Sequence, residues 1–175
     1  MTETITEPKV VPGKVWVGES VPRKEDKRLV QGQGVFFDDL RRHGMGYVHF
    51  VRAPYAHAAI TRIDLSKAAE LEGVYGTLIG EEAAALTDPF FELSIPPGAH
   101  IKDYALAVGK VRFQGEPVAA VVAETRELAR DAADLVEVDY EPLPAVVDGE
   151  QALADGAEIL HEDAGSNVVW HGEFD

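Results

Sequence analysis

Residues 117–123 (PVAAVVA) form the longest uninterrupted apolar run in the chain. The run covers about a third of the ~20 residues that a membrane-spanning helix needs, which argues against a membrane protein. It is typical of a strand that is covered on both faces. Thr125 follows as a candidate helix N-cap, and apolar residues then recur at helical spacing at Leu128, Ala132, Leu135 and Val136. With a further strand over residues 137–140, this segment predicts a buried strand followed directly by a helix that packs on it.

The rest of the chain shows the same mixture of short elements. Alternating apolar and polar residues, bounded by glycine or proline, predict strands over residues 46–52, 58–65, 74–79 and 106–113. Helices are predicted over residues 66–71, 80–86 and 149–154, and a long surface loop over residues 87–103. Because strands and helices do not alternate in a regular βαβ pattern, the fold class is α+β, with a mixed sheet and a few short helices.

Composition and charge exclude several classes of protein. The chain has 175 residues and no cysteine, which excludes iron–sulfur ligation, cysteine zinc sites and thiol nucleophiles within it. A net charge of −15 argues against nucleic-acid binding. Residues 1–10 contain acidic residues instead of a basic region followed by an apolar one, so no signal peptide is predicted. We therefore expect a soluble cytoplasmic protein.

No motif predicts a metal, phosphate or nucleophile site. None of the six histidines has a partner at the spacing that places two ligands on one helix face, so we interpret each as a hydrogen-bonding structural residue. They are His43, His49, His57, His100, His161 and His171. Residues 31–34 (QGQG) lack the remaining parts of a phosphate loop and predict a turn. No serine lies in a Gly-x-Ser-x-Gly motif. The sequence therefore predicts no catalytic, cofactor-binding or metal-binding residue.

A few polar residues allow two interpretations. Asp38 and Asp39 are adjacent, so their side chains point apart and predict a solvated turn in place of an acid–base pair. Glu116 and Gln114 precede the apolar run, a position that favours capping of the strand or contact with another domain over catalysis. For Trp16 and Trp170 the sequence is compatible with a position in a core or at an interface and does not distinguish between them.

Several phrases, taken together and in order, resemble one known family. They are residues 17–32, 37–39, 52–58 (RAPYAHA), 111–123 (VRFQGEPVAAVVA), 138–148 (VDYEPLPAVVD) and 160–162, with Asn167. The chain is similar over about residues 17–167 to the N-terminal α/β-hammerhead domain of the molybdenum-binding large subunits. These belong to the xanthine dehydrogenase, aldehyde oxidase and aerobic carbon monoxide dehydrogenase family.

The resemblance implies a domain division and a role. We expect a flexible arm over residues 1–14, the hammerhead domain over residues 15–155 and an irregular extension over residues 156–175. The family's pterin-binding loops and active-site glutamate have no counterpart here, so this chain by itself implies no bound cofactor. For the assembled enzyme, the resemblance implies molybdopterin, [2Fe–2S] clusters and FAD. The partners implied are the remaining molybdopterin-binding polypeptide, an FAD subunit and an iron–sulfur subunit.

Two alternatives stay open beside this structural role. One is a free-standing, non-catalytic binding or assembly module with the same fold. The other is an independent enzyme with a site around Arg52, His57, Gln114 and Glu116. The subunit hypothesis predicts an apolar face that is uncovered in the isolated chain. Candidates for that face are Phe90, Phe91 and Ile95 in the long loop, together with Trp16 and Trp170.

Overall fold

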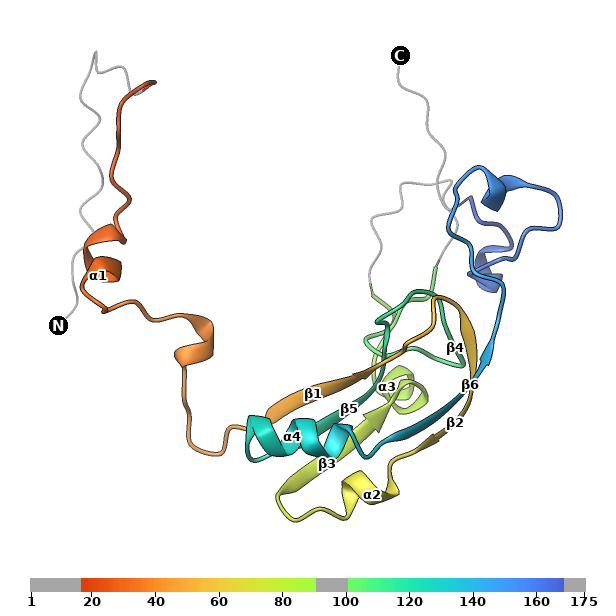
Figure 1. Cartoon of the computed structure of the whole chain (residues 1–175), viewed down its shortest axis with the longest axis horizontal. Helices are drawn as coiled ribbons and strands as arrows, with labels where there is room; N and C mark the ends of the chain where they lie inside the picture. The colour runs from red at the N-terminus through yellow and green to blue at the C-terminus, as the bar shows by residue number, and fades with distance from the viewer. Residues whose placement is uncertain (1–16, 91–100, 169–175) are drawn as a thin grey trace. The chain divides into compact units, whose positions relative to one another are not determined.

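The computed structural model describes residues 17–90 and 101–168. The chain forms two compact units, Met1–His43 and Gly44–Asp175 (Figure 1). We call residues 17–43, the described part of the first, the N-terminal unit, and we call the second the body. The predicted hammerhead range, residues 15–155, includes parts of both units.

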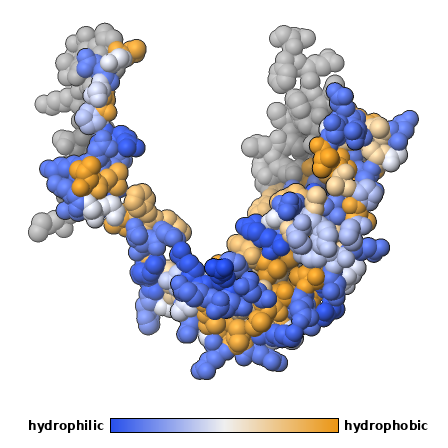
Figure 2. Space-filling view, in the orientation of Figure 1, coloured by the Kyte–Doolittle hydropathy of each residue, from blue (hydrophilic) through white to orange (hydrophobic). Residues whose placement is uncertain are grey.

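The N-terminal unit is built from local turns. It contains α1 (Asp26–Val30) and the 3-10 helix η1 (Phe37–Asp39), and none of residues 17–43 is buried. Residues 31–34 form the predicted turn, in which Gly32 has a φ of +69°, a conformation that glycine adopts readily. Phe36 is 65% and Phe37 90% exposed, and Figure 2 shows apolar surface on this unit. The unit therefore has local structure without a core.

The strands of the body divide into two three-stranded sheets. The orders are β1–β5–β3 and β4–β2–β6, and all neighbouring strands are antiparallel. The strands are β1 (Tyr47–Arg52), β2 (Ala58–Asp64), β3 (Val74–Ile79), β4 (Lys110–Val111), β5 (Pro117–Ala123) and β6 (Glu137–Pro142). The α+β class with a few short helices is confirmed. In place of one mixed sheet there are two antiparallel ones, because no neighbouring strands are joined by the single crossover helix that a parallel pair requires.

The central strand of the first sheet is the apolar run. β5 is buried along most of its length, as predicted, with Val118 and Val121 fully buried. One face of this sheet packs against α2 (Ser66–Ala69) and α4 (Arg126–Ala133) through Ala68, Val121, Ala132 and Ala133. Successive strand residues point to opposite faces, so Ala120 packs on the other side. There it meets Ala83 of α3 (Gly80–Leu86) and Leu106.

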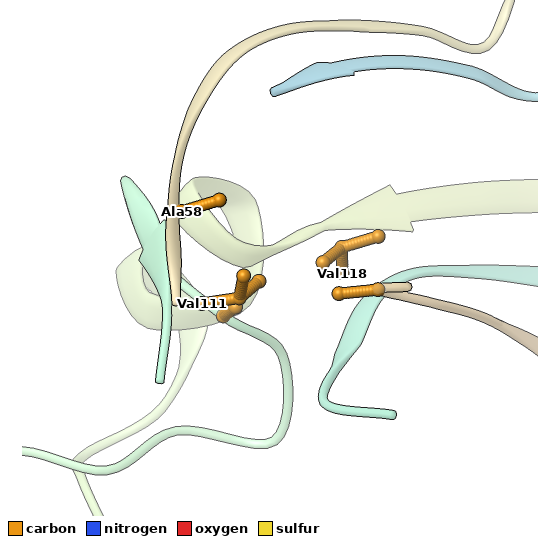
Figure 3. Close-up of a cluster of buried hydrophobic side chains, with 5 residues drawn as sticks. Ala58, Val111 and Val118 are labelled. Carbon is orange, nitrogen blue, oxygen red and sulfur yellow. The ribbon is translucent and has the colours of Figure 1, made fainter. Parts of the chain in front are cut away.

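A third apolar cluster joins the two sheets. Ala58 of β2, Val111 of β4 and Val118 of β5 have no exposed surface and belong to one cluster with Ala53 and Ala107 (Figure 3). Because these side chains come from both sheets, burying them fixes the sheets against each other. This cluster therefore holds the end of β1 and the starts of β2 and β5 in place.

One helix prediction is confirmed at its start, and a second differs at both ends. Thr125 accepts a hydrogen bond from the Leu128 amide (3.1 Å), as an N-cap should. The helix ends at Ala133 and not at Val136, because Val136 N donates to the carbonyl three residues earlier and the chain turns there. In place of the helix predicted over residues 149–154 there is the short 3-10 turn η2 (Gln151–Leu153), whose N-cap is Glu150; Asp148 Oδ1 still accepts from the amides of Glu150 and Gln151 (2.9 and 2.8 Å).

The strand predicted over residues 106–113 is reduced to the two residues of β4. Gly109 interrupts it with a φ of +69°, which breaks the extended conformation just before Lys110. Of the predicted loop over residues 87–103, residues 91–100 lie outside the described part of the chain, and so do Phe91, Ile95 and His100.

Candidate functional site

The polar residues singled out in the sequence meet first at the turn that leads into β5. Gly115, with a φ of +88°, reverses the chain, and the Glu116 carboxylate accepts a hydrogen bond from the Arg112 amide. Arg52 at the end of β1 donates from Nη1 to the Gly115 carbonyl (2.8 Å). Ala53 N also donates to the Glu116 carbonyl (2.9 Å). We call residues 112–116, held in this way, the strand-mouth turn.

Glu116 is half-buried in this turn, and that changes its proton affinity. Burial raises the pKa of the Glu116 carboxyl above its usual range, and the hydrogen bond from the Arg112 amide opposes that change. Because the carboxylate accepts a backbone N–H, its arrangement is that of a turn cap. Gln114 is exposed on the same turn. The geometry therefore supports capping of the strand over proton transfer for Glu116.

A small cavity lies beside the strand-mouth turn. It has a volume of about 260 Å³, and its polar lining includes Arg112, Glu116, Lys102 and Asp163. Lys102 Nζ and Asp163 lie 3.6 Å apart, and both side chains are more than half exposed. The cavity lining carries both signs of charge, and among its described residues no hydrogen bond joins a nucleophilic side chain to a base, the pairing that nucleophilic catalysis uses.

His57 lies at a different attachment point. It is 2% exposed, and its Nδ1 lies 2.8 Å from the Pro144 carbonyl oxygen. Since a carbonyl only accepts, Nδ1 carries the proton, and the buried Nε2 has no hydrogen-bond partner in the described residues. The Leu143 amide donates to the His57 carbonyl (3.0 Å). His57 therefore ties the segment after β6 to the start of β2, the structural role that the sequence predicted.

The four residues of the alternative catalytic site therefore fall into two groups. Arg52 and Glu116 hold the strand-mouth turn on which Gln114 lies, whereas His57 forms hydrogen bonds with Leu143 and Pro144. In the described residues no hydrogen bond links His57 to the other three. They form two structural joints, the name we give to points where side-chain hydrogen bonds fix one segment of the chain to another. Each lies at the beginning of a strand.

The sequence did not reveal a third joint, which fixes the chain after β6. Lys110 is 9% exposed, and its ammonium group donates to Glu162 at the start of the 3-10 helix η3 (Glu162–Ala164). This hydrogen bond lowers the pKa of Glu162. Arg112 Nε donates to the Leu160 carbonyl (2.9 Å). The available signal was a lysine within the strand predicted over residues 106–113, since an ammonium group that such a strand buries needs a partner.

Asn167 closes the same segment on itself. Its Oδ1 accepts from the Leu160 amide (3.1 Å), while its Nδ2 donates to the carbonyls of Ala152 and Glu158 (3.1 and 2.8 Å). Three bonds from one side chain hold this segment in place without regular secondary structure. Asn167 was among the residues that carried the family resemblance.

The remaining candidates are distributed over the surface or lie outside the described residues. Asp39 accepts from the Phe36 amide (2.9 Å) in η1, which fits the predicted solvated turn. His43 is exposed, and His49 is half-buried in β1. Phe90 is 61% exposed. Trp16, Trp170 and His171 lie outside the described residues.

Neither a metal centre nor a membrane span is found in the part of the chain that the structure describes. There, no group of three or more His, Asp or Glu side chains is placed to hold a metal ion, and the sequence has no cysteine. These residues do not fit a metal or iron–sulfur group on their own, and we derive no reaction step through one. No described helix has the length and apolar character needed to cross a bilayer.

The fold and the three joints define a class: a small α+β domain whose polar side chains fix turns and strand starts. Comparison with known families gives its membership. The family model described as "Aldehyde oxidase and xanthine dehydrogenase, a/b hammerhead domain" matches residues 31–144, and the chain belongs to this family. The resemblance found in the sequence is confirmed.

Individual relatives agree with this assignment. The chain is 44% identical over 141 residues to the carbon monoxide dehydrogenase large chain of Afipia carboxidovorans, covering 81% of this chain and 17% of the relative. It is 38% identical over 165 residues to the nicotine 6-hydroxylase large subunit of Paenarthrobacter nicotinovorans, covering 89% and 19%. The crystal structure of quinoline 2-oxidoreductase from Pseudomonas putida 86 superposes with a TM-score of 0.79 at 40% identity, covering 87% and 19%. The chain thus spans about one fifth of these relatives.

Proposed function

We propose that this chain is the N-terminal structural domain, or a split small component, of the large subunit of a molybdenum hydroxylase. It would provide scaffold and interface to the molybdopterin-binding part and no bond-making residue. The observation that carries the proposal is the family match over residues 31–144, together with relatives that cover most of this chain with only about a fifth of their own length. The proposed division remains an arm over residues 1–14, the hammerhead over 15–155 and an extension over 156–175.

The activity belongs, in this proposal, to the assembled enzyme. It would hydroxylate an aldehyde or an N-heterocycle in the cytoplasm, with carbon monoxide oxidation as the alternative within the family. Relatives named for carbon monoxide and for nicotine support both possibilities equally. Molybdopterin, [2Fe–2S] clusters and FAD would be held by the remaining molybdopterin-binding polypeptide, an iron–sulfur subunit and an FAD subunit. The molybdenum cofactor would supply the redox chemistry when bound there.

What this chain would contribute is rigidity at three fixed points. The strand-mouth turn fixes the end of β1 to the start of β5, His57 fixes the segment after β6, and Lys110 fixes the segment around Glu162. A surface held in this way loses little conformational entropy when a partner binds it. This is the property that a scaffold domain needs.

The decisive experiment is the native mass of the chain purified from its source, with molybdenum measured on the same sample. We expect a complex much larger than the chain's 19.0 kDa that carries molybdenum. A monodisperse 19.0 kDa monomer without molybdenum would instead support a free-standing binding module.

A second experiment separates the scaffold role from the alternative catalytic site. Glu116→Gln keeps an oxygen that can accept from the Arg112 amide but removes the carboxylate that proton transfer would need. We expect the assembled enzyme with this variant to keep its activity within about twofold. A loss of a hundredfold or more in a correctly assembled complex, typical for removal of a general acid or base, would favour a catalytic role for Glu116.

A further inference from the structure

The first sheet of the body has two edges, β1 and β3, and they differ in how open they are. In the described residues no strand pairs with the outer side of either. β3 carries a register shift between Val74 and Gly76, and irregularities of this kind are a common way of blocking an edge. β1 pairs with β5 in regular register from Tyr47 to Val51 and shifts only at Arg52. β1 is therefore the edge that is better prepared to accept another strand.

A groove runs along this open edge. Its volume is about 600 Å³, and it is lined by five consecutive residues of β1, 48–52, and by Ala133 and Asp134 at the end of α4. Val48 and Phe50 are 52% and 41% exposed, although they lie in a strand of the first sheet. An uncovered strand edge with apolar side chains is a template for pairing with another chain, so such edges are normally covered in a native protein.

We propose that an extended segment of the remaining molybdopterin-binding polypeptide adds to the outer edge of β1 as a fourth strand of this sheet. This inference rests on the proposed function. The occupant follows from the relatives, which carry more than four fifths of their length beyond the part that matches this chain. Backbone hydrogen bonds would supply the affinity, and alternate side chains of the added strand would cover Val48 and Phe50.

Charge further defines the added segment. Residues 44–175 contain eight Lys and Arg against 24 Asp and Glu, a net charge of −16, whereas the groove itself is lined by one base, Arg52, and one acid, Asp134. A segment with apolar residues at alternate positions suits the groove, and Lys or Arg at its other positions would complement the negative charge of the body around it. A second copy of this chain would bring the same negative charge to the interface, which disfavours a β1-to-β1 dimer.

Amide hydrogen exchange tests the proposal on the wild-type protein. Exchange at residues 48–52 is measured in the isolated 175-residue chain and in the molybdenum-containing enzyme from the source, with residues 74–79 of β3 as the matched edge. We expect exchange at residues 48–52 to slow by at least tenfold in the enzyme, and exchange at the β3 edge to change less. Equal exchange at residues 48–52 in both samples would overturn the proposal while leaving the proposed function intact. If no molybdenum complex contains the chain, both fail.

A variant pair checks that protection comes from strand addition. Val48→Lys with Phe50→Lys places two charges on the open edge, and Leu86→Lys, at a 77% exposed position that ends α3, is the control. For the double variant we expect one of two results. Either the tenfold slowing of exchange at residues 48–52 disappears, or tenfold less of the variant chain is recovered in the molybdenum-containing enzyme. The control variant should show neither effect. Thermal unfolding of the isolated variants verifies that they fold. Protection that persists in a folded double variant, or that depends on the concentration of the isolated chain, would contradict strand addition by the partner.

Discussion

The N-terminal unit and the body place their apolar side chains in opposite ways. In the body, the largest buried side chains are at most 2% exposed and lie in clusters that join sheets and helices; they are Leu106, Val111, Val118 and Val121. In the N-terminal unit, Phe37 is 90% exposed and none of residues 17–43 is buried. Charge differs as well, with a net −16 for residues 44–175 and +1 for residues 1–43.

The difference shows what holds each region in shape. The body is stabilised by burial of apolar area, which is the dominant favourable contribution to folding. The N-terminal unit relies on local bonds such as that from the Phe36 amide to Asp39. One family match over residues 31–144 extends across both, so residues 31–43 of the N-terminal unit belong to the shared domain although the described part of this unit has no core.

The largest expected effect comes from removing the same side chain in each region. Leu106→Ala in the body, where the side chain is 2% exposed, should lower the free energy of unfolding by about 3 kcal/mol through lost burial and a cavity. Leu40→Ala in the N-terminal unit, where the side chain is 44% exposed, should change it by less than about 0.5 kcal/mol. Urea denaturation of the isolated chain measures both. Equal effects would mean that the N-terminal unit has a packed core after all.

The second prediction tests how tightly the body is packed. A Cβ at Gly80 would lie 1.9 Å from the Ala107 carbonyl oxygen, so Gly80→Ala must displace backbone. We expect a loss of about 2–3 kcal/mol. Gly76→Ala is the matched control, because its Cβ would meet nothing within 4 Å. The difference between the two midpoints of thermal unfolding gives the result, and a Gly80→Ala protein as stable as Gly76→Ala would show that residues 107–108 move freely.

The third prediction concerns the joint at His57. His57→Ala removes the Nδ1 donor and leaves the Pro144 carbonyl without it, for an expected loss of about 1 kcal/mol. His57→Asn places an amide N–H near the position of Nδ1 and should recover part of that loss. Chemical denaturation of both variants decides. If alanine and asparagine destabilise equally, packing of the ring is what matters, and the hydrogen bond to the segment after β6 is dispensable.

The elements that could be predicted from the sequence are those defined by local pattern. β5 and the Thr125 cap depend on neighbouring residues, and both lie where they were predicted. The division into two sheets could not be predicted, because it depends on pairings such as Ile63 with Val138, which are far apart in the chain. Composition and spacing alone do not encode which distant strands meet.

The polar joints divide in the same way. The Glu116 cap uses an amide four residues away, and the sequence already favoured capping there over catalysis. The bonds from Lys110 to Glu162 and from Arg112 to the Leu160 carbonyl span about fifty residues, so no local sequence motif predicts them. They become visible only when the fold places the segment around Glu162 beside β4.

The smallest expected effect concerns this last joint, which ties an irregular segment to the core. The hydrogen bond from Lys110 lowers the pKa of Glu162 below its usual value of 4.5. A carboxyl with a lowered pKa in the folded state stabilises the protein above its unfolded pKa, and this contribution disappears as the pH falls through the folded value. Unfolding free energy should therefore decrease as the pH falls below about 4.5.

A double-mutant cycle isolates this contribution. Glu162 is 69% exposed, so the charge interaction should be worth only about 0.5 kcal/mol, even though Lys110 is nearly buried. Glu162→Gln keeps an oxygen acceptor and should flatten the pH dependence below about pH 4.5. In a Lys110→Met background, Glu162→Gln should have no such effect, because the cation is gone. The same flattening in both backgrounds would show that Glu162 acts without Lys110, and the segment after β6 would then resemble the N-terminal unit more than the body.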